Sequence, residues 1–173
     1  ARAAGLRTVA VAGGAEKGAL ATDTFGFDAA VDHRAHDEAR ALRKALADVA
    51  PEGVDIYWEN VAGTLLEAVL PLMNTHGRIP LCGTVAWGAG VEERADRLPG
   101  LWRSVLVKRL QVSGFIIFDH WDAFPDFLAD MTPRVAAGEI AFVEDVAEGI
   151  DAAPEAFIGM LQGRNRGKQL VAL

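Results

Sequence analysis

Short apolar runs alternate with segments of helical periodicity along most of this 173-residue chain. The early apolar runs are nearly continuous instead of alternating with polar residues, which is typical of strands covered on both faces. These runs lie at 6–12, 29–33, 54–58, 78–82 and 111–118, and helices are predicted between them at 16–25, 37–50, 64–73 and 99–110. The alternation predicts an α/β fold with a doubly wound parallel sheet.

Small or polar residues follow each predicted strand. They are Gly13-Gly14, Asp32-His33, Glu59-Asn60, Gly83-Thr84 and Asp119-His120. In open parallel sheets, ligands bind in the crevice beyond the carboxyl ends of the strands. We therefore expect these clusters to face one crevice. The polar, glycine-containing segment 87–100 is predicted to be a mobile loop over this site or a connector.

The alternation stops after residue 138. A helix strained by Pro133 is predicted over 122–138, and segment 140–146 alternates apolar with acidic residues. A short helix at 151–161 and a final strand at 169–173 follow. We therefore expect one domain over 1–138 and a separate return segment over 139–173.

Charge and cysteine content exclude several classes of protein. A net charge of -7 argues against binding to nucleic acid, which requires a basic face. The single cysteine, Cys82, excludes an internal disulfide and a multi-cysteine zinc site, and it fits a reducing cytoplasm. His36, His76 and His120 lack the spacing of zinc ligands, so we expect no metal. The sequence contains no apolar run of about 18 residues, so no membrane span is predicted.

An ordered set of motifs resembles the zinc-independent, NADP-dependent medium-chain reductases, which include prostaglandin and leukotriene reductases, alkenal double-bond reductases and curcumin-type reductases. The motifs are AGGAEK at 12–17, GFD at 26–28, YWENVAG at 57–63, CG at 82–83, GFII at 114–117, PEAF at 154–157 and NRGK at 165–168. The resemblance covers essentially the whole chain. It implies a Rossmann-like NADP(H)-binding domain, followed by a helix and strand of a GroES-like catalytic domain.

The resemblance assigns the 2'-phosphate of NADP(H) to Lys17. An acid beyond that strand would accept the ribose hydroxyls of NAD, whereas this chain has Gly13 and Gly14 at the strand end and a cation beyond them. The alternative is a solvated lysine on the first turn of a helix. His33 stands where relatives usually carry a tyrosine, and its imidazole can still donate to the phosphate. A surface histidine is the alternative there.

The other expected cofactor contacts follow from the same resemblance. Asn60 would bind a ribose or nicotinamide group, and Gly83 would let the backbone approach the cofactor closely. The remaining expected contacts are Cys82, Thr84, Val85, Phe115, Ile116, Ile117 and Asn165. Phe115, Ile116 and Ile117 are also predicted to lie in a core strand, Cys82 could be a buried small hydrophobe, and Asn60 and Asn165 could be turn residues.

The reaction that the resemblance implies is hydride transfer from NADPH to the β-carbon of an α,β-unsaturated ketone or aldehyde. No catalytic residue is assigned, because the tyrosine of some mammalian relatives falls at Val107. An NADPH:quinone reductase of the same superfamily and a non-catalytic NADP(H)-binding module remain alternatives. A homodimer formed through the fifth strand is also expected from the resemblance.

A dinucleotide-binding fold begins with a strand, a glycine-rich turn and a helix. This chain opens on residues 1–5, which read as the end of that helix, and no G-x-G-x-x-G follows. We therefore expect that the glycine loop precedes the chain and that its sheet lacks a central strand. Such a piece could be inactive by itself.

Overall fold

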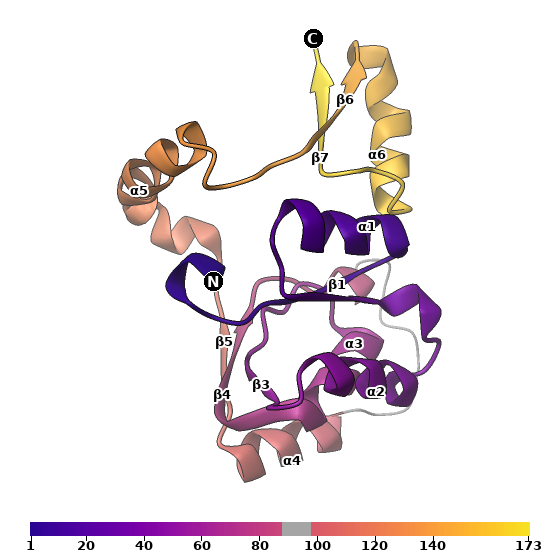
Figure 1. Ribbon diagram of the computed structural model, residues 1–173, viewed down its shortest axis with the longest axis vertical. Helices are drawn as coiled ribbons and strands as arrows, with labels where there is room; N and C mark the ends of the chain where they lie inside the picture. The colour runs from indigo at the N-terminus through magenta and orange to yellow at the C-terminus, as the bar shows by residue number, and fades with distance from the viewer. Residues whose placement is uncertain (88–97) are drawn as a thin grey trace. The chain divides into compact units, whose positions relative to one another are not determined.

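The computed structural model describes residues 1–87 and 98–173 and forms two compact units. One unit consists of residues 1–30 and 125–173, and the other of residues 31–124. The strands are β1 (Val9–Ala12), β2 (Ala29–Asp32), β3 (Val54–Ile56), β4 (Met73–Leu81), β5 (Gln111–Gly114), β6 (Glu144–Glu148) and β7 (Lys168–Ala172) (Figure 1). The helices are α1 (Ala15–Ala19), α2 (Ala39–Val49), α3 (Gly63–Val69), α4 (Leu98–Lys108), α5 (Phe124–Ala136) and α6 (Ala153–Leu161). Most of the expected loop 87–100 lies outside the described residues.

The unit of residues 31–124 is built on a parallel sheet in the order β3-β4-β5. Helices α2 and α3 contact each other, and the buried Leu42 and Leu46 form the apolar stripe of α2. Lys108 ties the end of α4 to the segment between α3 and β4. Its Nζ donates to the backbone carbonyls of Leu70, Pro71 and Met73 at 3.2, 2.6 and 2.6 Å. These contacts satisfy carbonyls that the end of a helix leaves unpaired.

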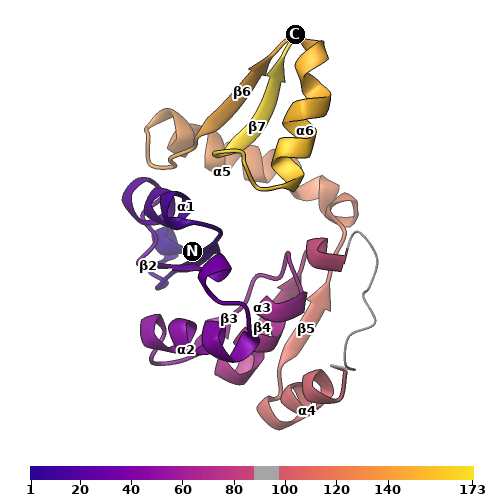
Figure 2. The same cartoon turned by 90° about the vertical axis from the view of Figure 1, so that its right-hand side faces the viewer.

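The other unit contains α1, which continues as a π-helical turn over Leu20–Thr24. The Asp28 carboxylate accepts from the backbone N–H of Thr8 at 2.6 Å and from its hydroxyl at 3.0 Å. These hydrogen bonds hold the pKa of Asp28 below its usual value. Strands β6 and β7 pair in parallel from Glu144 opposite Lys168 to Glu148 opposite Ala172. Helix α6 lies between them in the sequence and packs beside β7 (Figure 2).

Within the described residues, β1–β2 and β3–β4–β5 are hydrogen-bonded as separate sheets instead of one continuous sheet. The expectation that the sheet lacks a central strand stays a prediction. The expected order of strands and helices is confirmed. Strand β4 begins earlier than predicted, and β6 (Glu144–Glu148) lies partly within the segment 140–146, for which no element was predicted.

The prediction for the fifth strand is wrong beyond Gly114. The strand ends there, and Ile117–Ala123 forms a 3-10 helix. Ile116 and Ile117 are 61% and 56% exposed, so they are not core residues. The reason is that β5 is hydrogen-bonded only to β4 among the described strands, which leaves it at the edge of its sheet.

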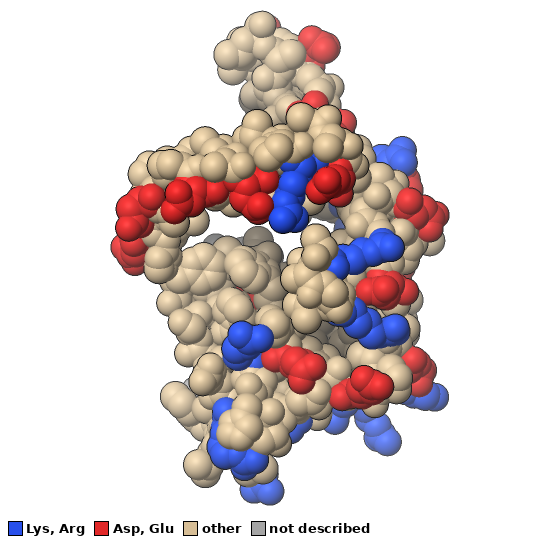
Figure 3. Space-filling model, turned by 60° about the vertical axis from the view of Figure 1, so that its left-hand side comes forward, with Lys and Arg blue, Asp and Glu red and all other residues tan. Residues whose placement is uncertain are grey.

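In the view of Figure 3, acidic side chains form a row along one arched segment, and basic side chains lie singly or in small groups without a broad basic surface. The charge pattern of this face agrees with the net charge of -7. It gives no support for binding to a phosphate backbone.

Candidate functional site

Two turns at the carboxyl ends of β3 and β4 are hydrogen-bonded to each other. We call segments 59–63 and 82–86 the paired turns. The N–H groups of Cys82 and Gly83 donate to the carbonyl of Glu59 at 2.9 and 3.1 Å, and Val85 N–H donates to the carbonyl of Asn60 at 3.1 Å. The structure thus brings together the predicted residues Asn60, Cys82, Gly83, Thr84 and Val85. Cys82 is exposed, so its interpretation as a buried small hydrophobe is wrong, because β4 ends one residue before it.

Gly83 allows the paired turns to approach closely. A Cβ at this position would lie 3.4 Å from the backbone oxygen of Asn60, which is tighter than most real Cβ contacts. Ala62 and Gly63 both have positive φ angles, 68° and 61°, so the chain reverses sharply after Val61. Ala62 adopts this conformation although it carries a Cβ, which costs free energy that other contacts must offset.

Glu59 is the residue that stabilises this reversal. Its side chain is 1% exposed, and its Oε1 accepts from the backbone N–H groups of Val61 and Ala62, both at 2.7 Å. Sequence reasoning placed Glu59 in a strand-end cluster and gave it no role. The available signal was an acid directly after an apolar strand and before a turn containing glycine.

Tyr57 lies near Glu59 in the same unit. Within the described part of the chain, the buried Tyr57 hydroxyl and Glu59 Oε2 have no hydrogen-bond partner. Burial raises the pKa of Tyr57 well above its usual value, and the negative charge of Glu59 raises it further. The ionised form of this phenol is therefore strongly disfavoured in the folded chain.

We expect Tyr57 to make folding stability depend on pH in alkaline solution. Its pKa is higher in the folded than in the unfolded chain, where it is about 10. Its contribution is therefore complete below about pH 10 and is lost as the pH rises through the folded-state pKa. The free energy of unfolding should fall more steeply between about pH 10 and 11 for the wild type than for Tyr57→Phe.

Urea unfolding at a series of pH values measures this difference. Tyr57 is the only tyrosine of the chain, so its ionisation can also be followed by absorbance without interference. The absorbance change should accompany unfolding and not precede it. Parallel stability curves for the wild type and Tyr57→Phe would contradict the assignment.

Aromatic contacts connect Phe115 to the end of β3. The rings of Trp58 and Phe115 meet edge to face, with centroids 5.7 Å apart and an interplanar angle of 64°. The ring of His120 also lies near that of Phe115, with centroids 6.4 Å apart. Phe115 is therefore held beside residue 58, one position before the paired turns, although it is not in a core strand.

The other unit brings together Lys17 and the loop that contains Asn165. Lys17 Nζ donates to the carbonyl of Gly163 at 2.7 Å, and Arg166 Nε lies 3.4 Å from Glu16 Oε1. Asn165 donates from its side chain to the carbonyl of Gly167 at 2.8 Å. In this structure it is therefore a turn residue, which is the alternative given for it in the sequence analysis. Lys17 is half-buried, which differs from a fully solvated lysine.

Before α1, the turn at Gly13 and Gly14 is open. Gly14 has a φ of 91°, and a Cβ there would meet nothing within 4 Å. No acid stands between the end of β1 and α1. His33 is exposed in the 3-10 turn His33–Ala35 that follows β2. The single crevice predicted for all the strand ends stays a prediction, because these ends belong to two units.

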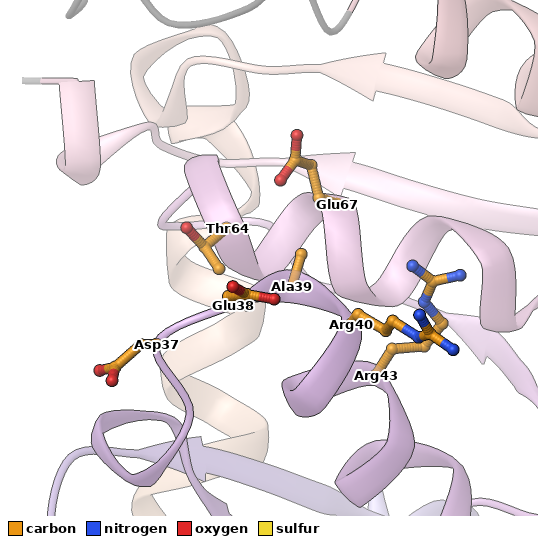
Figure 4. A pocket seen from close by; sticks show the side chains of 7 residues that line it. All are labelled: Asp37, Glu38, Ala39, Arg40, Arg43, Thr64 and Glu67. Carbon is orange, nitrogen blue, oxygen red and sulfur yellow. The ribbon is translucent and has the colours of Figure 1, made fainter.

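A cavity of about 550 Å³ lies in the unit of residues 31–124. Figure 4 shows its lining side chains, which come from the turn before α2, from α2 and from α3: Asp37, Glu38, Ala39, Arg40, Arg43, Thr64 and Glu67. None of these was predicted as a site residue. A cavity of about 290 Å³ in the other unit includes Asn165 in its wall.

Residues 1–87 and 98–173 contain neither a metal-ligand cluster nor a membrane-spanning helix. No group of three or more His, Cys, Asp or Glu residues is placed there to hold a metal ion. None of the helices in these ranges is both long and apolar enough to cross a membrane.

Residues 1–132 match the family model described as zinc-binding dehydrogenase. The chain belongs to this family. It is 45% identical over 170 residues to the NADPH-dependent curcumin reductase of Escherichia coli (strain K12). The matched region covers 96% of this chain and 48% of that protein. It is 38% identical to a 2-alkenal reductase (NADP(+)-dependent) of Nicotiana tabacum, over 96% of this chain and 47% of that protein.

Among solved structures, this zinc-binding dehydrogenase family member is similar to CurA from Vibrio vulnificus in complex with NADPH. The two are 43% identical with a TM-score of 0.88, over 98% of this chain and 50% of that chain. The chain thus spans about half the length of the relatives it matches. The predicted resemblance and the predicted Rossmann-like α/β fold are confirmed. The absence of a metal stays a prediction.

Proposed function

We propose that this chain is the nucleotide-binding part of an NADPH-dependent oxidoreductase that reduces the carbon-carbon double bond of α,β-unsaturated ketones or aldehydes. The observation that carries the proposal is the similarity, above 40% identity along nearly the whole chain, to the curcumin reductase and to the CurA structure solved with NADPH. The 2-alkenal reductase, at 38% identity, supports the same substrate class.

The residues at the end of β1 fit NADP(H). In the turn at Gly13 and Gly14, a Cβ at Gly14 would meet nothing within 4 Å, and no acid stands between the end of β1 and the start of α1. Lys17 supplies a cation to the 2'-phosphate. His33 would donate to the same phosphate, and Asn60 would bind a ribose or nicotinamide group.

The paired turns would hold the nicotinamide half of the cofactor. When bound, NADPH supplies the hydride for the reduction. Backbone groups of Cys82, Gly83, Thr84 and Val85 line one of these turns, and the backbone of Phe115–Ile117 and the side chain of Asn165 would complete the contacts. Val107 lies in α4 and is aliphatic, so it cannot donate a proton. We therefore assign no proton donor to this chain.

We also propose the larger organisation that the sequence predicts. Residues 1–138 form the nucleotide-binding domain, and residues 139–173 return to a GroES-like catalytic domain. We propose that the protein is a homodimer in the cytoplasm. The edge position of β5 among the described strands and the exposed Ile116, Ile117 and Phe118 after it support the dimer. Sedimentation velocity of the full chain tests the dimer.

The function is tested by NADPH oxidation with an enone and with a quinone, side by side, on the full chain. We expect turnover of the enone with NADPH and much slower turnover with NADH. Preferred turnover of the quinone would favour a quinone reductase. Tight NADPH binding without reduction of any enone or quinone would favour a non-catalytic module.

A further inference from the structure

Loop Gly163–Gly167 between α6 and β7 holds Arg166 in a defined position. The backbone N–H of Arg166 donates to Asp145 Oδ2 at 2.8 Å, which ties it to β6. The preceding Asn165 donates from its side chain to the carbonyl of Gly167 at 2.8 Å, which closes the turn. The direction in which the chain presents Arg166 is therefore fixed by contacts on both sides of it.

The same loop is joined to the first turn of α1 at two points. Lys17 Nζ donates to the carbonyl of Gly163 at 2.7 Å. Arg166 Nε lies 3.4 Å from Glu16 Oε1. Residues that are about 150 positions apart in the sequence thus place the guanidinium of Arg166 beside the neighbour of Lys17.

Arg166 leaves N–H donors for an anion at this contact. Glu16 alone would oppose binding of a phosphate to the adjacent Lys17, and Arg166 neutralises it. The Arg166 side chain is 61% exposed, and its guanidinium carries N–H donors beyond the one that faces Glu16. Lys17 and Arg166 carry two positive charges, against the negative charges of Glu16 and of Asp145, whose carboxylate accepts from the backbone N–H of Arg166.

We propose that Arg166 is a second cation for the 2'-phosphate of NADPH, in addition to Lys17, and that it helps the protein to discriminate NADPH from NADH. This inference rests on the proposed function and names a further residue of the same site. A guanidinium can bind a phosphate through two parallel N–H donors, whereas an ammonium acts as a point charge. Arg166 would therefore add directional binding to the charge that Lys17 supplies.

The test is the Arg166→Met variant of the full chain, with Kd values measured by nucleotide fluorescence titration. We expect the Kd for NADPH to rise about tenfold and the Kd for NADH to change less than about twofold. Unchanged NADH binding also shows that the variant is folded. Arg164→Met is the matched control, since it removes the same charge from the same loop and breaks only the exposed pair with Glu155. It should leave both Kd values unchanged.

A second pair of variants separates direct contact from neutralisation of Glu16. In a Glu16→Gln background, Arg166→Met should still raise the Kd for NADPH about tenfold. If the effect disappears in that background, Arg166 acts only through Glu16 and the proposal is overturned. Equal losses for NADPH and NADH would also overturn it. A wild-type protein that does not prefer NADPH would instead contradict the proposed function itself.

Discussion

Replacing Lys17 by methionine is expected to raise the Kd for NADPH about 30-fold and to leave the Kd for NADH within about twofold. Only NADPH carries the 2'-phosphate, so only its binding should depend on the ammonium group. The contact of Nζ with the carbonyl of Gly163 at 2.7 Å uses one of the three donors of Lys17 and orients the others. Methionine preserves an unbranched apolar stem and removes the charge.

Isothermal titration of the full chain with each nucleotide measures this effect. Lys44→Met is the matched control, because Lys44 is exposed on α2 and carries the same charge. The preference for NADPH in the wild type should also weaken as ionic strength rises, since exposed charges are screened by salt. If Lys17→Met weakened NADPH and NADH binding equally, the lysine would stabilise the loop at Gly163 instead of binding the phosphate.

The order of strands and helices could be predicted from the sequence because each apolar run is bounded by glycine, proline or a polar cluster. The end of the fifth strand could not. Residues 111–118 are apolar enough for a strand, but apolar composition does not show that β5 is an edge strand. The chain turns into a 3-10 helix at Ile117 and leaves apolar side chains exposed.

The two parts of the candidate site differ in how far local sequence could reveal them. The turn at Gly13 and Gly14 followed by Lys17 is a local pattern, and the resemblance gave it a role. The contact of Lys17 with Gly163 joins residues that are 146 positions apart, and no local pattern predicts it. The role of Glu59 depends on the positive φ of Ala62. The sequence does not predict this conformation, because alanine rarely adopts it.

Replacing Glu59 by alanine is expected to lower the free energy of unfolding by about 3 kcal/mol. The carboxylate accepts two backbone N–H groups in a buried turn, and alanine would leave both unpaired and create a void. Because natural domains are stable by only about 5–15 kcal/mol, this change removes a large part of the total. Nucleotide binding should weaken as well, since Asn60 and Gly83 depend on the same turn.

Urea unfolding at neutral pH compares Glu59→Ala with Glu59→Gln and with Glu52→Ala, which removes an exposed carboxylate. Glutamine keeps an acceptor oxygen for Val61 and Ala62, so Glu59→Gln should cost far less than Glu59→Ala. Its amide N–H groups can also donate to the unpartnered Tyr57 hydroxyl. Equal losses for glutamine and alanine would show that the negative charge, and not the two hydrogen bonds, stabilises the turn. That result would in turn require a cation or donor that faces Oε2 in the full chain, since a buried charge without such a partner is destabilising.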